Sequence, residues 1–255
     1  MGGAIALSSS QAMSATPSCT LTAEQEEGPY YIDYETMRQD ISEGKPGVPL
    51  KLRIALVDAN RCSPLENAAV DIWHCDAVGV YSGFTAEGGG RGGPGRGPGG
   101  PGGPPPGRGN RQTDATRFLR GVQVSDTQGL VEFGTLYPGW YEGRTIHIHL
   151  KVHLNGHVSH TGQVFLPEDL TEQIAKLEPY AKHSNVHRTT QSEDHVFTSQ
   201  HGSGSIASMT RLRNGSNEDG FLATVTVAID PEATPQLVGG PGRGGPPQNL
   251  KSFNP

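Results

Sequence analysis

Residues 146–153 alternate aliphatic and polar side chains without interruption, which predicts a β-strand with one buried face. Side chains two residues apart project from the same face of a strand. The aliphatic set that would face the core consists of Ile146, Ile148, Leu150 and Val152. His147 and His149 would then project together from the other face, with their Cα atoms roughly 7 Å apart. Two imidazoles in this arrangement can share one metal ion.

The same period of two recurs along the chain and predicts the fold class. Leucine and isoleucine alternate with Lys51, Arg53 and Ala55 between residues 50 and 56. Further strand-like runs, separated by turn residues, occupy 69–74, 118–124, 130–136 and 221–229. Helical spacing is found at Glu168–Leu177, after Pro167. We therefore expect an all-β protein, a β-sandwich of mostly antiparallel strands with a prealbumin-like core, long loops and a short helix.

The length of 255 residues suits one sizeable domain once the segments of low complexity are set aside. We expect a flexible N-terminal segment at 1–20, a folded domain at 21–237 and a Gly/Pro-rich tail at 238–255. Residues 88–110 consist largely of glycine, proline and arginine and cannot bury a core. We expect this insertion to form a surface loop that is dispensable for folding.

Charge and hydropathy argue against two classes of partner. A formal net charge of -6 disfavours binding to nucleic acid or to an anionic membrane. The surroundings of Arg91, Arg96, Arg108 and Arg243 resemble RGG segments but lack interleaved aromatic residues for base stacking. No stretch approaches the roughly 20 apolar residues that a transmembrane helix requires. We expect neither nucleic acid nor a membrane as a partner.

The three cysteines, Cys19, Cys62 and Cys75, form no C-x-x-C pair and therefore no zinc ribbon or thioredoxin-type motif. Cys62 and Cys75 flank a predicted turn and strand, so they are the disulfide pair that we favour. Three buried thiols are the alternative. The Asn214-Gly215-Ser216 sequon fits a glycosylation site or a hairpin turn equally well.

A histidine pair on an exposed strand face is more often solvated than coordinating, so a metal site needs further ligands. His153 shares the predicted face but lies about 20 Å from His147 along the strand. With His157 and His160 it forms a cluster beside the Asn155-Gly156 turn. Because this cluster is not on a predicted helix, we do not favour it as a second metal site.

Two tyrosines lie close to turn motifs before and after predicted strands. Tyr141 ends Pro138-Gly139-Trp140-Tyr141, and Tyr81 ends Gly79-Val80-Tyr81. With Asp71-Ile72-Trp73-His74 and Arg144-x-x-His147-x-His149, these motifs resemble, in order and spacing, the intradiol ring-cleavage dioxygenases, the family of protocatechuate 3,4-dioxygenase and catechol 1,2-dioxygenase. Glu27-Gly28-Pro29-Tyr30-Tyr31 is similar to the family's N-terminal motif. The likeness runs from about Glu24 to Gln163.

The resemblance implies a non-haem iron(III) centre whose ligands are Tyr81, Tyr141, His147 and His149. Ferric iron is a hard acid that can deprotonate a phenol far below its free pKa of about 10, whereas zinc seldom recruits tyrosine. The resemblance also implies that Tyr141 leaves the metal when substrate chelates and takes up a substrate proton, while Tyr81 stays bound. Arg144 and Gln163 would stabilise negative charge that develops on the ring.

The enzyme implied by the resemblance is an oxidoreductase of aromatic catabolism that uses dioxygen to open catechol-type rings between the two hydroxyls. Both oxygen atoms would enter the product, a muconate-type diacid. The catechol-specific branch of the family carries a helical dimerisation segment, for which the residues before Glu24 leave no room, so we favour a monomer. The chain is more similar to single-domain extracellular members, so we expect secretion, although the first twenty residues lack the basic start and apolar centre of an intact signal peptide.

Two rival functions remain open on the sequence. A non-catalytic β-sandwich binding module is indicated by Pro64–Val70, whose pattern also occurs in prealbumin-like domains. An iron(II) extradiol dioxygenase would need two histidines and one carboxylate, for which Asp71 and Asp76 are the candidates. Neither rival accounts for the tyrosine pair.

Overall fold

The computed structural model describes residues 20–33, 36–85, 112–212, 219–235 and 238. Five sequence predictions fall wholly or mainly on other parts of the chain: the N-terminal segment 1–20, the insertion 88–110, the tail 238–255, the state of Cys19 and the Asn214 sequon. They lie outside the described residues, and the division of the chain into these segments stays a prediction.

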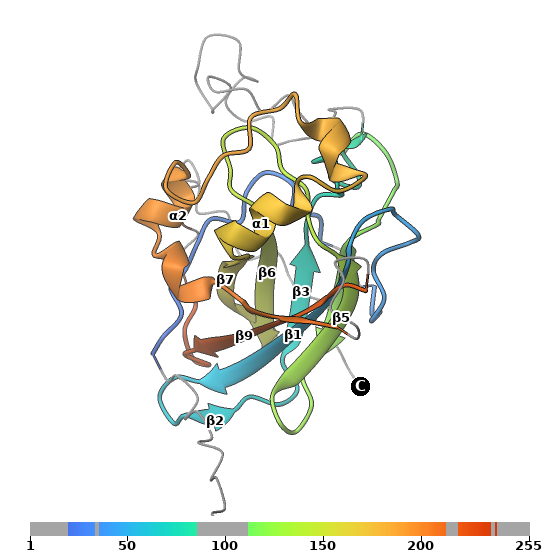
Figure 1. Ribbon diagram of the computed structural model, residues 1–255. Coiled ribbons are helices and arrows are strands. Elements are labelled where there is room, and N and C mark those ends of the chain that lie inside the picture. Colours follow the sequence, from blue (N-terminus) through green and yellow to red (C-terminus); the bar gives the residue numbers. More distant parts are fainter. Residues whose placement is uncertain (1–19, 34–35, 86–111, 213–218, 236–237, 239–255) are drawn as a thin grey trace, which may run out of the picture.

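Two β-sheets pack face to face, as the alternation predicts (Figure 1). The first sheet contains β1 (Pro49–Asp58), β2 (Ser63–Pro64), β5 (Leu130–Leu136), β8 (Ser208–Arg211) and β9 (Phe221–Ile229). The second has the order β4 (Arg120–Val124), β3 (Ala69–Trp73), β6 (His147–Leu154) and β7 (His157–Phe165). Neighbouring strands run antiparallel except β1 and β9, which are parallel. The prediction of a mostly antiparallel β-sandwich is confirmed.

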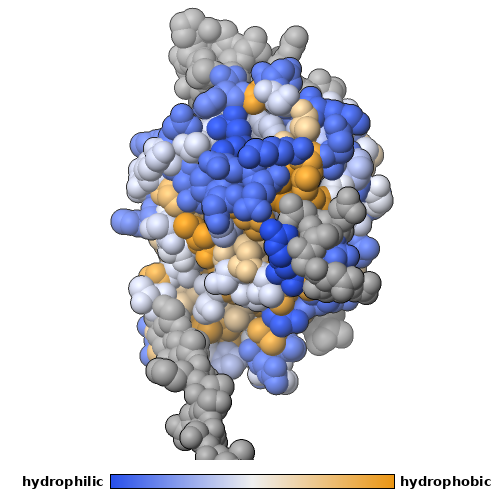
Figure 2. Space-filling model, viewed as in Figure 1, coloured by the Kyte–Doolittle hydropathy of each residue, from blue (hydrophilic) through white to orange (hydrophobic). Residues whose placement is uncertain are grey.

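The core lies between the sheets and is made by the alternating aliphatic residues. The first sheet contributes Leu50, Leu52, Ile54 and Leu56, and the second contributes Ile148, Leu150 and Val152, none more than 2 % exposed. Burying each such side chain contributes roughly 1.5–3 kcal/mol. The outer face of the first sheet carries ion pairs of Lys51 and Arg53 with Glu132. Hydrophilic and hydrophobic residues are accordingly interspersed on the face seen in Figure 2.

Two of the predicted turns have the backbone that their residues favour. Asn155 and Gly156 both have positive φ, 52° and 81°, as a two-residue hairpin between β6 and β7 requires. Asp126 accepts backbone hydrogen bonds from Gln128 and Leu130, which closes the turn before β5.

The alternation did not identify β2, β7 or β8. In β7 the side chains are largely buried although many are polar, so no apolar period marks the strand. The N-terminal strap, residues 20–33, pairs with these polar side chains: Nδ1 of His160 lies 2.5 Å from the Glu24 carboxylate, and Nε2 of Gln163 donates to the carbonyl oxygen of Glu26 at 2.8 Å. Burial of polar residues on β7 therefore depends on a segment far away in the sequence.

Helices are few and short, and they lie beside the sandwich (Figure 1). The predicted helix is present as α1 (Glu168–Ile174). A second helix, α2 (His195–Ser199), and short 3-10 turns at Tyr180–His183 and Gly202–Ser205 were not predicted. Within the described part of the chain, every helix is too short or too polar to span a membrane.

The predicted disulfide between Cys62 and Cys75 is wrong. Cys75 is a free thiol, 2 % exposed, and lies 3.5 Å from the carbonyl oxygen of Gly139, whereas Cys62 is disulfide-bonded. Cys75 follows β3 into the packed interior beneath the 138–141 turn, so it does not face Cys62. The spacing of the cysteines along the sequence does not indicate which way the Cys75 side chain points.

Candidate metal centre

His147 and His149 occupy the face of β6 away from the sandwich core, as predicted, but they are buried, at 2 % and 1 % exposed. Nδ1 of His147 lies 2.6 Å from the carbonyl oxygen of Thr145, to which it can donate a hydrogen bond. In that tautomer Nε2 of His147 carries no proton and has a free lone pair. It lies 3.0 Å from Nε2 of His149, so the two nitrogens converge on one point.

The turns that carry the two tyrosines are pressed together at their backbones. Gly139 donates its N–H to the carbonyl oxygen of Asp76 at 3.1 Å. A Cβ at Gly79 would clash with the carbonyl oxygen of Trp140, and the φ of Gly79 is 80°. Glycine is required at such a close approach.

As a result, the rings of Tyr81 and Tyr141 lie 5.9 Å apart between their centroids. The phenolic oxygen of Tyr141 is 3.2 Å from Nε2 of His147, and the Tyr81 ring centroid is 6.3 Å from that of His149. The structure thus brings together all four side chains that the sequence analysis proposed as ligands.

The donor atoms of this cluster fit a metal ion. The buried phenolic oxygen of Tyr81 has no hydrogen-bond partner of good geometry, although Tyr81 is close enough to Tyr141 to affect its pKa. Among the described residues, no group of three or more His, Cys, Asp or Glu side chains could hold a metal ion. A centre here must therefore include the phenols, and a mixed set of oxygen and nitrogen donors suits a hard transition-metal cation.

Electrostatics point the same way. Burial raises the pKa of both tyrosines above the usual value, and Arg144 partly opposes this for Tyr141. Burial also lowers the pKa of both histidines, so they are neutral and able to donate lone pairs. A buried phenol gives up its proton only when a strong positive charge compensates, and a bound cation supplies that charge.

Aromatic side chains surround the four donors. The indole of Trp73 stacks on His149 with ring centroids 4.9 Å apart, and Tyr30 of the strap stacks on Tyr81 at 4.4 Å. Phe84 contacts Tyr30 edge-on. The strap backbone at Gly28 lies so close to His149 that an added Cβ would be 3.1 Å from the imidazole. The strap therefore seals the histidines from solvent.

Arg144 and Gln163 lie together at the edge of this cluster. Nη2 of Arg144 donates to Oε1 of Gln163 at 2.5 Å, and Nε2 of Gln163 donates to the carbonyl oxygen of Glu26 at 2.8 Å. The sequence analysis missed two carboxylates that bind Arg144, those of Glu26 and Asp194. Asp194 precedes α2 in a region with no distinctive motif, so only its position as a helix N-cap could have marked it.

The alternative metal sites are not formed by the described residues. His160 pairs with Glu24 through Nδ1, and His157 lies 3.1 Å from the Ser159 hydroxyl. Neither histidine belongs to a group that could bind a metal. Asp76 is engaged by Lys45 at 2.7 Å and by backbone N–H groups of its own turn.

Asp71 does not complete a facial triad either. Its carboxyl group is hydrogen-bonded to Tyr31, and burial raises its pKa to about 8. No described group of two histidines and a carboxylate can hold a metal.

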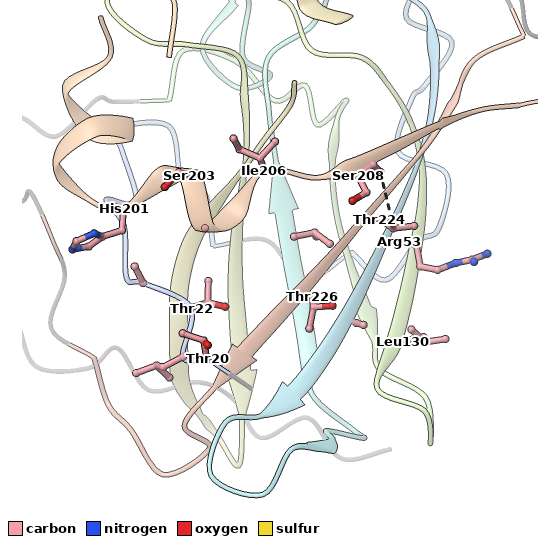
Figure 3. Close-up of a pocket in the computed structure, with 15 residues that line it drawn as sticks. Thr20, Thr22, Arg53, Leu130, His201, Ser203, Ile206, Ser208, Thr224 and Thr226 are labelled. Atoms are coloured by element: carbon pink, nitrogen blue, oxygen red, sulfur yellow. Dashed lines mark hydrogen bonds between the residues drawn. The ribbon is translucent and has the colours of Figure 1, made fainter. Parts of the chain in front are cut away.

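A groove of about 780 Å³ lies elsewhere, on the outer face of the first sheet (Figure 3). Thr224 and Thr226 of β9 and Arg53 of β1 line it together with His201 and Ser203. None of the four proposed donors lines this groove, so it is separate from the candidate centre.

Fold and site together define a β-sandwich protein with a buried cluster of two tyrosines and two histidines. An intradiol ring-cleavage dioxygenase from Tetranychus urticae is 35 % identical to this chain in sequence. The match covers 86 % of this chain and 98 % of the other, with a TM-score of 0.74. A second solved dioxygenase is 36 % identical over the same shares, with a TM-score of 0.73. The dioxygenase domain of a carbohydrate-binding fusion from Streptomyces sp. SirexAA-E shares the fold at 22 % identity and a TM-score of 0.55, covering 82 % of this chain and 98 % of the other.

The chain belongs to the intradiol ring-cleavage dioxygenases and is an oxidoreductase. The sequence matches no protein-family model, and no curated protein matches it. The family assignment therefore stands on the fold, on the identity to solved dioxygenases and on the likeness found in the motifs.

Proposed function

We propose that this enzyme binds one ferric ion through Tyr81, Tyr141, His147 and His149 and cleaves catechol-type rings between their hydroxyls. The observation that carries the proposal is the clustering of two neutral imidazoles with the buried phenol of Tyr81 and the partly buried phenol of Tyr141. Both oxygens of a catecholate would chelate a ferric ion held by these residues, and the ion would supply the activation of the ring toward dioxygen.

The two tyrosines are proposed to have different roles because their surroundings differ. Tyr81 is 3 % exposed and covered by Tyr30, so it is positioned as a permanent ligand. Tyr141 is only partly buried and lies 3.2 Å from His147. Tyr141 is therefore the tyrosine whose oxygen would be free to accept a substrate proton and act as general base, while the other three residues would hold the metal.

Arg144 and Gln163 are proposed to act on charge. The guanidinium of Arg144 lowers the pKa of Tyr141, against the effect of burial, so it stabilises negative charge near that oxygen. Gln163 fixes one end of the guanidinium through its amide oxygen. A preorganised donor pair of this kind stabilises charge that develops in the transition state.

The substrates are proposed to be a catechol-type aromatic and dioxygen. The flat rings of Trp73, Tyr30, Tyr31 and Phe84 beside the donors support a planar aromatic ligand. In the balanced reaction, the carbon–carbon bond between the two hydroxyl-bearing carbons breaks and each carbon gains one oxygen atom. The product is a muconate-type diacid, as in the catabolism of aromatic compounds.

The regiochemistry of a single turnover tests this proposal. Iron-loaded enzyme is given catechol or 4-methylcatechol under ¹⁸O₂, and the product is analysed by mass spectrometry. We expect a muconic acid with one labelled oxygen in each new carboxyl group. A yellow semialdehyde would mean extradiol cleavage, an unlabelled quinone would mean simple oxidation, and the absence of any product would favour a binding module.

We further propose that the enzyme is secreted and monomeric. The disulfide at Cys62 supports secretion, because disulfides persist in oxidising compartments. Detection of the enzyme in the medium of its native cells, with a monomer mass in light scattering, is the expected result. An enzyme retained in the cytosol or a stable dimer would contradict these two points.

A further inference from the structure

We propose that Asp194 is a positioning residue for the ring-cleavage reaction, which holds the Arg144 guanidinium in its working orientation. The inference rests on the proposed function, because it assumes that Arg144 acts on charge at the centre. Asp194 comes from the segment before α2, more than thirty residues after the last residue that the sequence resemblance covers.

Asp194 is 0 % exposed, and its carboxylate is saturated with donors. Nε of Arg144 donates to both oxygens, at 3.2 and 3.1 Å. The backbone N–H of Thr145 donates to Oδ2 at 2.9 Å, and that of Val196 donates to Oδ1 at 2.8 Å. A buried carboxylate with this set of partners is a fixed point, because every oxygen is held by the backbone as well as by Arg144.

The guanidinium is anchored on all three of its nitrogens. Asp194 binds Nε, Glu26 binds Nη1 at 3.2 Å and Gln163 binds Nη2 at 2.5 Å. Arginine has five N–H groups in one rigid plane, so three anchors fix the plane and leave two N–H groups for other acceptors. Of the three anchoring side chains, Asp194 is the least exposed.

The same carboxylate reaches the histidine strand. Thr145 donates its N–H to Asp194 and accepts at its carbonyl oxygen from Nδ1 of His147. Asp194 therefore contacts both the Arg144 guanidinium and the Thr145 backbone, whose carbonyl oxygen orients His147. An error of about 1 Å in the placement of such groups can lower a rate about 100-fold.

Asp194 also caps α2, so the test must separate orientation of Arg144 from support of the fold. Asp194→Asn and Asp194→Ser both keep a good N-cap residue and remove the negative charge. Asn keeps one of the two acceptor oxygens, whereas Ser replaces both with a single hydroxyl. Thr198→Ala is the matched control, since the Thr198 hydroxyl donates to the backbone carbonyl oxygens of Asp194 and His195 and so supports the start of α2 through these oxygens rather than through the Asp194 carboxylate. Arg144→Met supplies a second genetic background, in which Asp194 no longer has the guanidinium to orient.

In iron-loaded enzyme, Asp194→Asn should lower kcat about 10- to 100-fold while iron content and the resting visible band stay at the wild-type level. Combined with Arg144→Met, the same substitution should cost less than about 3-fold, because its partner is already absent. Thr198→Ala should leave kcat unchanged. If Asn at position 194 prevents folding, the Ser variant is measured in its place.

Three results would overturn the proposal: equal losses in both backgrounds, an unchanged kcat in Asp194→Asn, or unfolding of both the Asn and Ser variants. A wild-type enzyme without iron-dependent ring cleavage would instead refute the proposed function. The two failures are therefore distinguishable.

Discussion

The indole plane of Trp73 is parallel to the imidazole plane of His149, within 2°. Trp73 and His149 are direct partners across β3 and β6, so the strand register sets this stack. His147 is fixed differently, through its hydrogen bond to the carbonyl oxygen of Thr145. Each ring thus has one orientation, and the two Nε2 atoms lie 3.0 Å apart.

The first prediction follows from this arrangement. His147→Ala and His149→Ala should each lower iron affinity by more than the roughly 10- to 100-fold typical of losing a supporting contact, and turnover should disappear. His157→Ala, on the neighbouring strand, should keep both. Metal content after gel filtration and the rate of catechol consumption measure the effect. Equal losses in all three variants would show that the ligand histidines were chosen wrongly.

The second prediction concerns colour. Loaded with one iron per chain, the protein should be red-brown, because tyrosinate-to-iron(III) charge transfer absorbs visible light. Tyr81→Phe should remove most of this band. The control is Tyr137→Phe, because Tyr137 is also fully buried but binds Thr171 at 2.6 Å, away from the four donors. A colourless protein with stoichiometric zinc would contradict the assignment.

The third prediction is a loss of stability in acid that depends on His74. Both ring nitrogens of this buried histidine are hydrogen-bonded, to Cys75 and to Thr135, and burial lowers its pKa to about 4. The unfolded chain has the usual histidine pKa of about 6.5, so it binds the proton more readily than the folded state. Stability is therefore full above about pH 6.5 and falls as the pH drops toward 4, by roughly 3 kcal/mol in total.

Urea unfolding of the apoprotein between pH 7.5 and 4.5 measures this effect. His74→Gln should show a shallower pH dependence than wild type over that window, because the titrating group is gone. Identical slopes in the two proteins would show that His74 is not responsible.

The fourth prediction is that deletion of residues 89–107 leaves the melting temperature nearly unchanged. The described residues on either side of the insertion already hold each other. Asp114 accepts from the backbone N–H of Thr85 at 2.9 Å, and Thr113 donates its N–H to the carbonyl oxygen of Gly83 at 2.7 Å. Because these flanking residues are already held together, closing a shorter loop between them costs little entropy. Calorimetry of the deletion variant is the measurement, and failure to fold would mean that the insertion is structural.

Local pattern was enough to predict much of the fold, whereas the set of four proposed donors came from the resemblance to a known family. The alternation at Ile146–Val152 placed His147 and His149 on one face, and the motifs that carry the resemblance marked Tyr81 and Tyr141. The same reasoning treated that face as open to solvent. It is buried because the strap crosses it, and that contact joins segments more than a hundred residues apart.

Other features depend on three-dimensional direction and could not be predicted from spacing. Asp194 meets Arg144 only because α2 begins beside the histidine strand. Cys75 turns inward toward Gly139, whereas Cys62, at a positive φ of 54°, is bonded elsewhere. A sequence pattern reports which face a residue occupies, and it does not report what covers that face.

The parallel pairing of β1 with β9 has a consequence for how the protein is made. Leu50 pairs with Phe221 and Asp58 with Ile229, so this partner of β1 is translated some 170 residues later. Contacts of such high sequence separation slow folding. During synthesis, the first sheet lacks its central pair until β9 has left the ribosome, although every proposed iron ligand has emerged long before. The nascent chain therefore carries its complete ligand set for several seconds, at typical elongation rates of about 5–20 residues per second, before the first sheet is complete.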